Sequence, residues 1–171
     1  YVLRILLKYF GIGVVSIAVA IVALTMFAGG EDYNTDFPSP NALDAVAWPD
    51  AIGGSPVDIQ GLDAAQLAEM QFVGSGLFGL TARYGQGAAV TAIQTGNQQL
   101  LDAYVATVKP RLESYSNRSS GKLNGAWWIK ASGASGRIYG WQKQNWFYLI
   151  ETANDDLFDE VVEKLPYISS R

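Results

Sequence analysis

The chain has 171 residues, a net charge of −4, and neither histidine nor cysteine. These absences exclude a Ser-His-Asp triad, a thiol nucleophile, disulfides, His-ligated haem, and zinc or iron–sulfur sites held by cysteine. The acidic balance also argues against nucleic acid as a partner, because domains that bind nucleic acid usually carry a basic patch.

The N-terminal region contains a long apolar stretch over residues 9–30, YFGIGVVSIAVAIVALTMFAGG, with no charged residue. A helix rises about 1.5 Å per residue, so about 20 such residues match a hydrocarbon core about 30 Å thick. We therefore expect a membrane-anchor region over residues 1–30, with a transmembrane helix over about residues 9–30. A buried core helix is the alternative, but cores seldom need so long an uncharged run near a chain terminus.

Charges on the two sides of this stretch differ in sign. Arg4 and Lys8 precede it, whereas Glu31 and Asp32 follow it. The positive-inside rule then places the N-terminus in the cytoplasm and the rest of the chain on the periplasmic or other extracytoplasmic side. A cleaved signal peptide is the competing interpretation, yet the apolar centre of such a peptide usually spans only about 7–15 residues. The sequence therefore favours an uncleaved signal anchor in a single-pass membrane protein.

Residues 31–61 form a polar segment with little periodicity, in which prolines and paired glycines interrupt any regular pattern. We expect an irregular connector here, held against its own domain or against a partner subunit. The length of residues 62–171 suits one α+β domain with its own core. Within it, residues 62–70 favour a short helix, and two strands over residues 72–84 and 88–95 are joined by a Gly-Gln-Gly turn.

The second half of the domain repeats this mixture of helix and strand. Asn97 is a favourable N-cap for a helix over residues 98–110, which Pro110 should end or kink. A polar loop is expected over residues 114–121, and Asn154 is a favourable N-cap for a last helix. Three strands and this last helix are predicted over residues 126–131, 137–143, 145–152 and 155–165.

A shift of 57 residues aligns two stretches of the chain. The pattern Ile-x-Thr-x-Asn occurs at residues 93–97 and again at residues 150–154, each time between a strand and an Asn-capped helix. We infer a duplicated β-β-α unit. Two such units most simply build one antiparallel sheet with both helices on one face, a fold that is ferredoxin-like in the loose sense. Chance similarity between two strands that each precede an Asn-capped helix is the alternative.

Aromatic side chains crowd the last three predicted strands. Neighbouring residues of a strand point to opposite faces and the helices cover one face, so half of these rings should lie on the other. An exposed aromatic face would bind a protein, lipid or other ligand, whereas folding of residues 31–61 over it would bury it; the sequence leaves both alternatives open. Basic residues of the same strands would form a rim for lipid phosphates or an acidic subunit. The predicted partner-binding residues are Trp127, Trp128, Tyr139, Trp141 and Trp146, with Lys130, Arg137 and Lys143 as the basic rim.

Two patterns that suggest chemistry do not meet its requirements. The four acidic residues within residues 155–160 suit the capping and dipole interactions of a helix N-terminus better than metal binding. The letters GxGxxG occur at residues 74–79, but without the preceding strand and following helix of a dinucleotide-binding turn. We therefore predict no catalytic residue, no metal site and no cofactor.

These observations favour a non-catalytic protein. The first hypothesis is an accessory or structural subunit of a multi-subunit membrane complex, of respiratory or photosynthetic type, whose extracytoplasmic domain braces partner subunits. Its partners would be other membrane-protein subunits and the lipid bilayer, and not nucleic acid. The alternative is a membrane-tethered periplasmic binding module for a lipid, a pigment or a small ligand.

Overall fold

The chain divides into two compact units, one formed by residues 1–34 with residue 171 and the other by residues 35–170. The first contains one described strand, β1 (Tyr33–Asn34). The computed structural model describes residues 33–62, 67, 76–123 and 126–171.

Two predicted helices cannot be compared with the structure. The predicted transmembrane helix over residues 9–30 lies outside the described residues, and so does most of the predicted helix over residues 62–70. Among the helices in the described ranges, none combines the length and the apolar character that a membrane crossing requires. The membrane anchor therefore stays a prediction.

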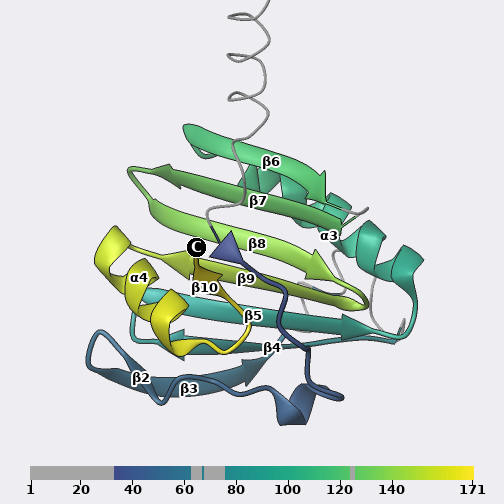
Figure 1. Cartoon of the computed structure of the whole chain (residues 1–171), viewed down its shortest axis with the longest axis horizontal. Coiled ribbons are helices and arrows are strands. Elements are labelled where there is room, and N and C mark those ends of the chain that lie inside the picture. The colour runs from purple at the N-terminus through teal and green to yellow at the C-terminus, as the bar shows by residue number, and fades with distance from the viewer. Residues whose placement is uncertain (1–32, 63–66, 68–75, 124–125) are drawn as a thin grey trace, which may run out of the picture. The chain divides into compact units, whose positions relative to one another are not determined.

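Over its described residues, the second unit is built on an antiparallel sheet with two complete α-helices, which confirms the predicted α+β class (Figure 1). Its helical elements are η1 (Leu43–Ala45), α3 (Gln98–Leu112) and α4 (Asp155–Lys164). Its strands are β2 (Ala51–Ile52), β3 (Ser55–Gly61), β4 (Leu77–Tyr84), β5 (Ala88–Thr95), β6 (Asn117–Leu123), β7 (Ala126–Gly133), β8 (Gly136–Lys143), β9 (Trp146–Thr152) and β10 (Ser169–Ser170). Eight of them form one sheet in the order β2-β3-β4-β5-β9-β8-β7-β6, in which every neighbouring pair is antiparallel.

The two outer parts of this sheet differ from the prediction. β3 lies within the segment predicted as an irregular connector, and Gly53 and Gly54 form the two-residue turn of a β2–β3 hairpin, with φ of 55° and 74°. Such turns need positive φ at both positions, which glycine adopts without strain. β6 lies largely within the predicted polar loop. It is the edge strand beside β7, and edge strands are commonly polar because one side faces water.

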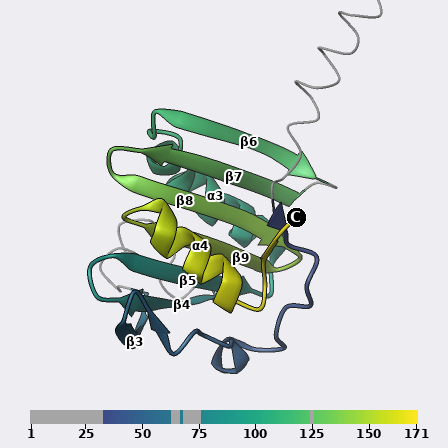
Figure 2. The same cartoon turned by 60° about the vertical axis from the view of Figure 1, so that its left-hand side comes forward.

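The two helices lie on opposite faces of the sheet, so the predicted arrangement with both on one face is wrong (Figures 1 and 2). Phe147 of β9 belongs to the core beneath α3, whereas the next residue, Tyr148, stacks on Tyr167, which follows α4. The register gives the reason. Ile93 pairs with Phe147, and Ile150, its equivalent in the inferred repeat, lies three residues from Phe147. Residues an odd number apart on a strand point to opposite faces, so Ile93 and Ile150 lie on opposite faces of the sheet. The helix that follows β5 and the helix that follows β9 therefore pack on opposite sides.

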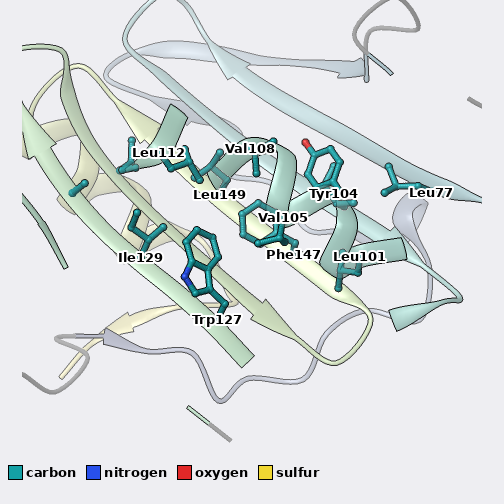
Figure 3. Close-up of a cluster of buried hydrophobic side chains, with 13 residues drawn as sticks. Leu77, Leu101, Tyr104, Val105, Val108, Leu112, Trp127, Ile129, Phe147 and Leu149 are labelled. Carbon is teal, nitrogen blue, oxygen red and sulfur yellow. The ribbon is translucent and has the colours of Figure 1, made fainter. Parts of the chain in front are cut away.

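Each helix begins at the predicted asparagine cap. The Asn97 side chain accepts a hydrogen bond from the backbone N–H of Gln99 at 2.9 Å, and the Asn154 side chain accepts one from Leu157 at 2.9 Å. The apolar stripe of α3 packs on β4, β5, β7, β8 and β9 (Figure 3). α3 also continues past Pro110 to Leu112, which is fully buried. Burial of this last turn therefore outweighs the cost of proline near the helix end.

Candidate functional site

The structure buries most of the predicted aromatic residues and divides them between the two faces. Trp127 lies in the core beneath α3. Tyr139, Trp141 and Trp146 are on the α4 face with at most 2% of their surface exposed. Trp128 is half-buried and lies over Gly121 of the edge strand. Four of the five rings are therefore buried within the domain, Trp127 beneath α3 and the other three on the α4 face.

The rings on the α4 face form a stack. The Tyr148 ring stacks on three others, with centroid distances of 5.0 Å to Trp141, 5.6 Å to Trp146 and 5.3 Å to Tyr167. The Tyr167 hydroxyl in turn accepts a hydrogen bond of 2.8 Å from the backbone N–H of Ala47. The predicted connector thus contacts this side of the sheet, as the burial alternative supposed. Burial in the stack raises the pKa of the Tyr148 hydroxyl.

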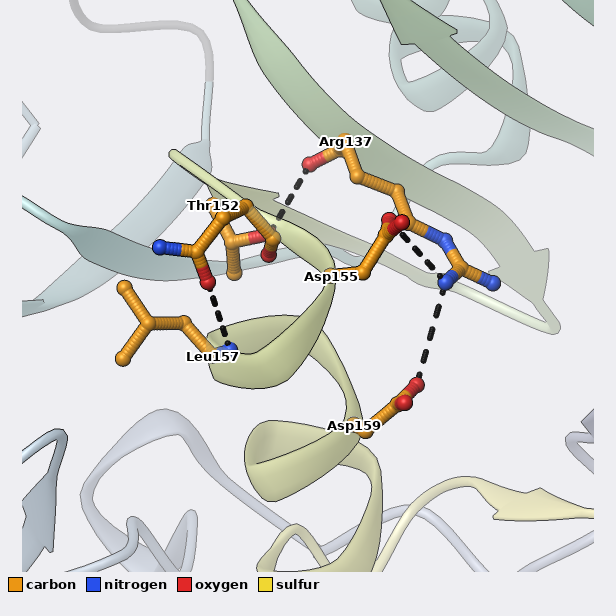
Figure 4. A network of polar contacts seen from close by, with 6 residues as sticks. Arg137, Thr152, Asp155, Leu157 and Asp159 are labelled. Carbon is orange, nitrogen blue, oxygen red and sulfur yellow. Dashed lines mark hydrogen bonds and ion pairs between the residues drawn. The ribbon is translucent and has the colours of Figure 1, made fainter.

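Two members of the predicted basic rim are paired within the domain. Arg137 lies 3.3 Å from Asp155 and 3.7 Å from Asp159 (Figure 4). Its guanidinium also lies over the ring of Phe158. Lys143 forms an ion pair of 3.0 Å with Asp36. These charges neutralise acidic residues of α4 and of the connector. Partner binding through Trp128 and Lys130 stays a prediction.

A polar pocket lies elsewhere, where two hairpin turns flank the end of β9. Its volume is about 280 Å³. Small-molecule sites for drug-sized ligands usually span about 300–1,000 Å³, so this pocket suits a ligand of monosaccharide or amino-acid size. The β4–β5 turn supplies one wall, and Ser135 of the β7–β8 turn and Tyr115 after α3 supply others. The lining residues are Arg83, Gly85, Gln86, Gly87, Ala88, Ala89, Tyr115, Ser135, Glu151, Thr152 and Ala153.

Strand register brings the charged groups of this pocket to one face. Arg83 pairs with Ala89, and Ala89 pairs with Glu151, so all three point to the same side. Glu151 is two residues from Leu149, which contacts the α3 core, so this is the α3 face. Because α3 ends at Leu112, the end of this face is open for a pocket.

Glycines allow the two turns to approach β9 closely. Gly85 has φ of 59°, and the backbone N–H of Ala153 donates a hydrogen bond of 2.8 Å to the Gly87 carbonyl. Gly136, at the start of β8, has φ of 117°, and a Cβ there would collide with the Thr152 carbonyl oxygen. Both turns are thereby fixed beside the end of β9.

The two arginines of this region differ in their pairing with described residues. Arg111 of α3 donates a hydrogen bond of 2.6 Å to Glu151 Oε1. Burial alone would lower the pKa of Arg111, but the hydrogen bond to Glu151 and its charge outweigh burial and raise this pKa. Burial raises the pKa of the neighbouring Tyr104. The charge of Arg111 lowers this pKa and the charge of Glu151 raises it, and both of these effects are smaller than that of burial. Arg83, by contrast, is exposed and has no hydrogen bond or ion pair with a described residue.

Sequence reasoning did not predict this pocket. The Gly85–Gly87 turn was predicted, but Arg83, Tyr115, Ser135 and Glu151 come from four segments that only the strand order brings together. No local spacing connects them, so no motif search could have found the set. The available signal was the hairpin turn itself, because turns at strand ends are frequent places for binding residues.

Neither metal chemistry nor a known relative defines the site. Over the described ranges, no three His, Cys, Asp or Glu side chains come together in a way that could hold a metal ion. No protein-family model, curated protein or solved structure matches the chain.

Proposed function

We propose that this protein is a non-catalytic binding module that holds a small polar ligand in the pocket between the β4–β5 and β7–β8 turns. The observation that carries the proposal is the guanidinium of Arg83, which lines the pocket without an ionic partner among the described residues. The predicted signal anchor would tether this module to a membrane, with the pocket on the extracytoplasmic side. The sequence supports the non-catalytic part, because the commonest general base and the thiol nucleophile are absent from the chain.

Nuclear magnetic resonance tests the proposal directly. The full-length chain, labelled with ¹⁵N and purified in mild detergent, is titrated with a panel of neutral and charged sugars, amino acids, carboxylates and phosphates. At least one compound should shift the amide signals of Gly85 and Gly87 in a saturable way. The amide of Gly54, in the β2–β3 turn outside the pocket, serves as the internal control. A panel that leaves Gly85 and Gly87 unmoved contradicts the proposal.

The accessory-subunit hypothesis remains the second candidate, and one surface feature favours it. Phe78 and Ile59 are large apolar residues that are 65% and 49% exposed. They lie on neighbouring strands, β4 and β3, and the register places both on the α4 face. Ile59 pairs with Ala82, four residues from Phe78, so the two side chains are separate exposed apolar positions on one face that a partner surface would cover.

Purification of the native membrane complex tests this second candidate. A partner chain should co-purify with the wild-type protein in constant proportion, should be lost with the double variant Phe78→Ser/Ile59→Ser, and should be retained with Phe78→Leu. Quantitative mass spectrometry of the purified material measures all three. If no chain accompanies the wild type in constant proportion, the accessory-subunit hypothesis is wrong.

A further inference from the structure

We infer that the ligand of this pocket is a hydroxylated anion, whose carboxylate or phosphate group binds Arg83 and whose hydroxyl group binds Glu151. This inference rests on the proposed function and specifies its ligand class. It starts from the charges of the pocket. Arg111 neutralises Glu151 at a distance of 2.6 Å, which leaves Arg83 as the lining cation without an ion pair to any described residue.

The acidic residue opposite Arg83 in the strand register forms no ion pair with it. Asp58 of β3 lies directly opposite Arg83. Its carboxylate instead accepts a hydrogen bond of 2.6 Å from the side-chain amide of Gln60, and no ion pair joins Asp58 to Arg83. A guanidinium presents several N–H donors in a plane, a geometry that matches a carboxylate or a phosphate. The ligand group that best satisfies Arg83 is therefore an anion.

The other polar groups of the pocket favour hydroxyl groups on the same ligand. Arg111 engages Oε1 of Glu151, and Oε2 accepts no hydrogen bond from a described residue. A carboxylate oxygen accepts hydrogen bonds and cannot donate them, so its partner must be a donor such as a hydroxyl. Ser135 adds a hydroxyl of its own, and Tyr115 adds a ring to the wall. Sugar acids and sugar phosphates combine these features at a size that suits about 280 Å³.

Three probes of the same carbon skeleton test the inference. Glucuronate, glucose 6-phosphate and glucose are titrated into the full-length chain, and their affinities are taken from the Gly85 and Gly87 amide shifts. At least one of the two anions should bind about tenfold more tightly than glucose. The ratio between glucuronate and glucose 6-phosphate distinguishes a carboxylate from a phosphate as the preferred group.

Charge variants assign the effect to Arg83. Arg83→Gln should weaken binding of the preferred anion by about 10-fold to 100-fold, as expected when a hydrogen bond to a charged group is lost. Arg83→Lys should restore part of that affinity. Lys122→Gln is the matched control, because Lys122 is an exposed cation of β6 that does not line the pocket, and it should change affinity by less than about twofold. The unfolding midpoint of each variant verifies that it folds.

The possible failures separate the inference from the proposed function. If glucose binds as tightly as both anions, or if Arg83→Gln leaves the affinity unchanged, the anionic ligand is wrong but the binding module stands. The same conclusion applies if only neutral compounds of the wider panel shift Gly85 and Gly87. If no compound of any charge shifts them, the proposed function itself is wrong.

Discussion

Tyr84 connects the sheet to the predicted connector through its hydroxyl group. Removal of this hydroxyl group gives a quantitative test of the structure. The side chain is 2% exposed, and its hydroxyl donates a hydrogen bond of 2.9 Å to the Pro49 carbonyl. Tyr84→Phe keeps the ring but leaves this carbonyl without its donor. We expect a loss of about 1–2 kcal/mol in the free energy of unfolding at neutral pH.

The same substitution should change how stability depends on pH. Burial, together with the negative charge of Asp50, raises the pKa of Tyr84 to about 12. An unfolded tyrosine has a pKa of about 10, so below pH 10 the hydroxyl keeps its proton in both states. Between pH 10 and pH 12 only the unfolded state releases the proton, and the stability contributed by Tyr84 is lost as pH rises. By pH 11 the loss should be about 1 kcal/mol.

Urea unfolding of the full-length chain, followed by tryptophan fluorescence at pH 8 and pH 11, measures both effects. The stability difference between wild type and Tyr84→Phe should be smaller at pH 11 than at pH 8. Taking this difference cancels the titration of Tyr104 and Tyr148, which is common to both proteins. A difference that is equal at the two pH values would refute the buried, protonated Tyr84, and no difference at pH 8 would refute its hydrogen bond.

Three further substitutions test the turns, the caps and the core. Gly136→Ala should lower the free energy of unfolding, measured by thermal unfolding, by about 2 kcal/mol or more, because its φ of 117° and the collision with the Thr152 carbonyl oxygen both oppose a side chain. Gly54→Ala, at a position with open space, should lower it by less in the same assay. Asn154→Ala should cost about 1 kcal/mol and should speed hydrogen exchange in the first turn of α4, and unchanged exchange would contradict the cap. Phe158→Ala should cost about 3–5 kcal/mol in urea unfolding, because the ring is fully buried beneath Arg137, and a loss below 1 kcal/mol would place that ring outside the core.

The central strands could be predicted because their sequences carry strong local signals. β5, β7, β8 and β9 have apolar or aromatic residues between glycine- or asparagine-containing turns, and the structure places strands there. The caps Asn97 and Asn154 were predictable for the same reason, because a cap acts on the next few residues. Local chemistry thus identified the strands beside each turn and the start of each helix.

The outer strands and the helix placement could not be predicted in this way. β6 has the sequence NRSSGKL, which is polar because an edge strand gains little from burial, and so it resembles a loop. β3 contains Pro56 and begins at a glycine turn, features that also mark irregular segments. The faces of α3 and α4 depend on the β5–β9 register, a contact between residues more than 50 positions apart. The pocket depends on the same long-range pairing.

The β5–β9 register also restricts how the two units of the inferred repeat can be related. In a homodimer whose two-fold axis runs perpendicular to a shared antiparallel sheet, equivalent residues of the two chains point to the same face. Here Ile93 and Ile150 point to opposite faces. If the chain arose by gene duplication, its ancestor could have formed a symmetric dimer through this strand. The two copies of the strand in that dimer must then have paired in a register shifted by one residue from the present β5–β9 register. Fusion into a single polypeptide would have removed that requirement, allowing one helix on each side and a core on both.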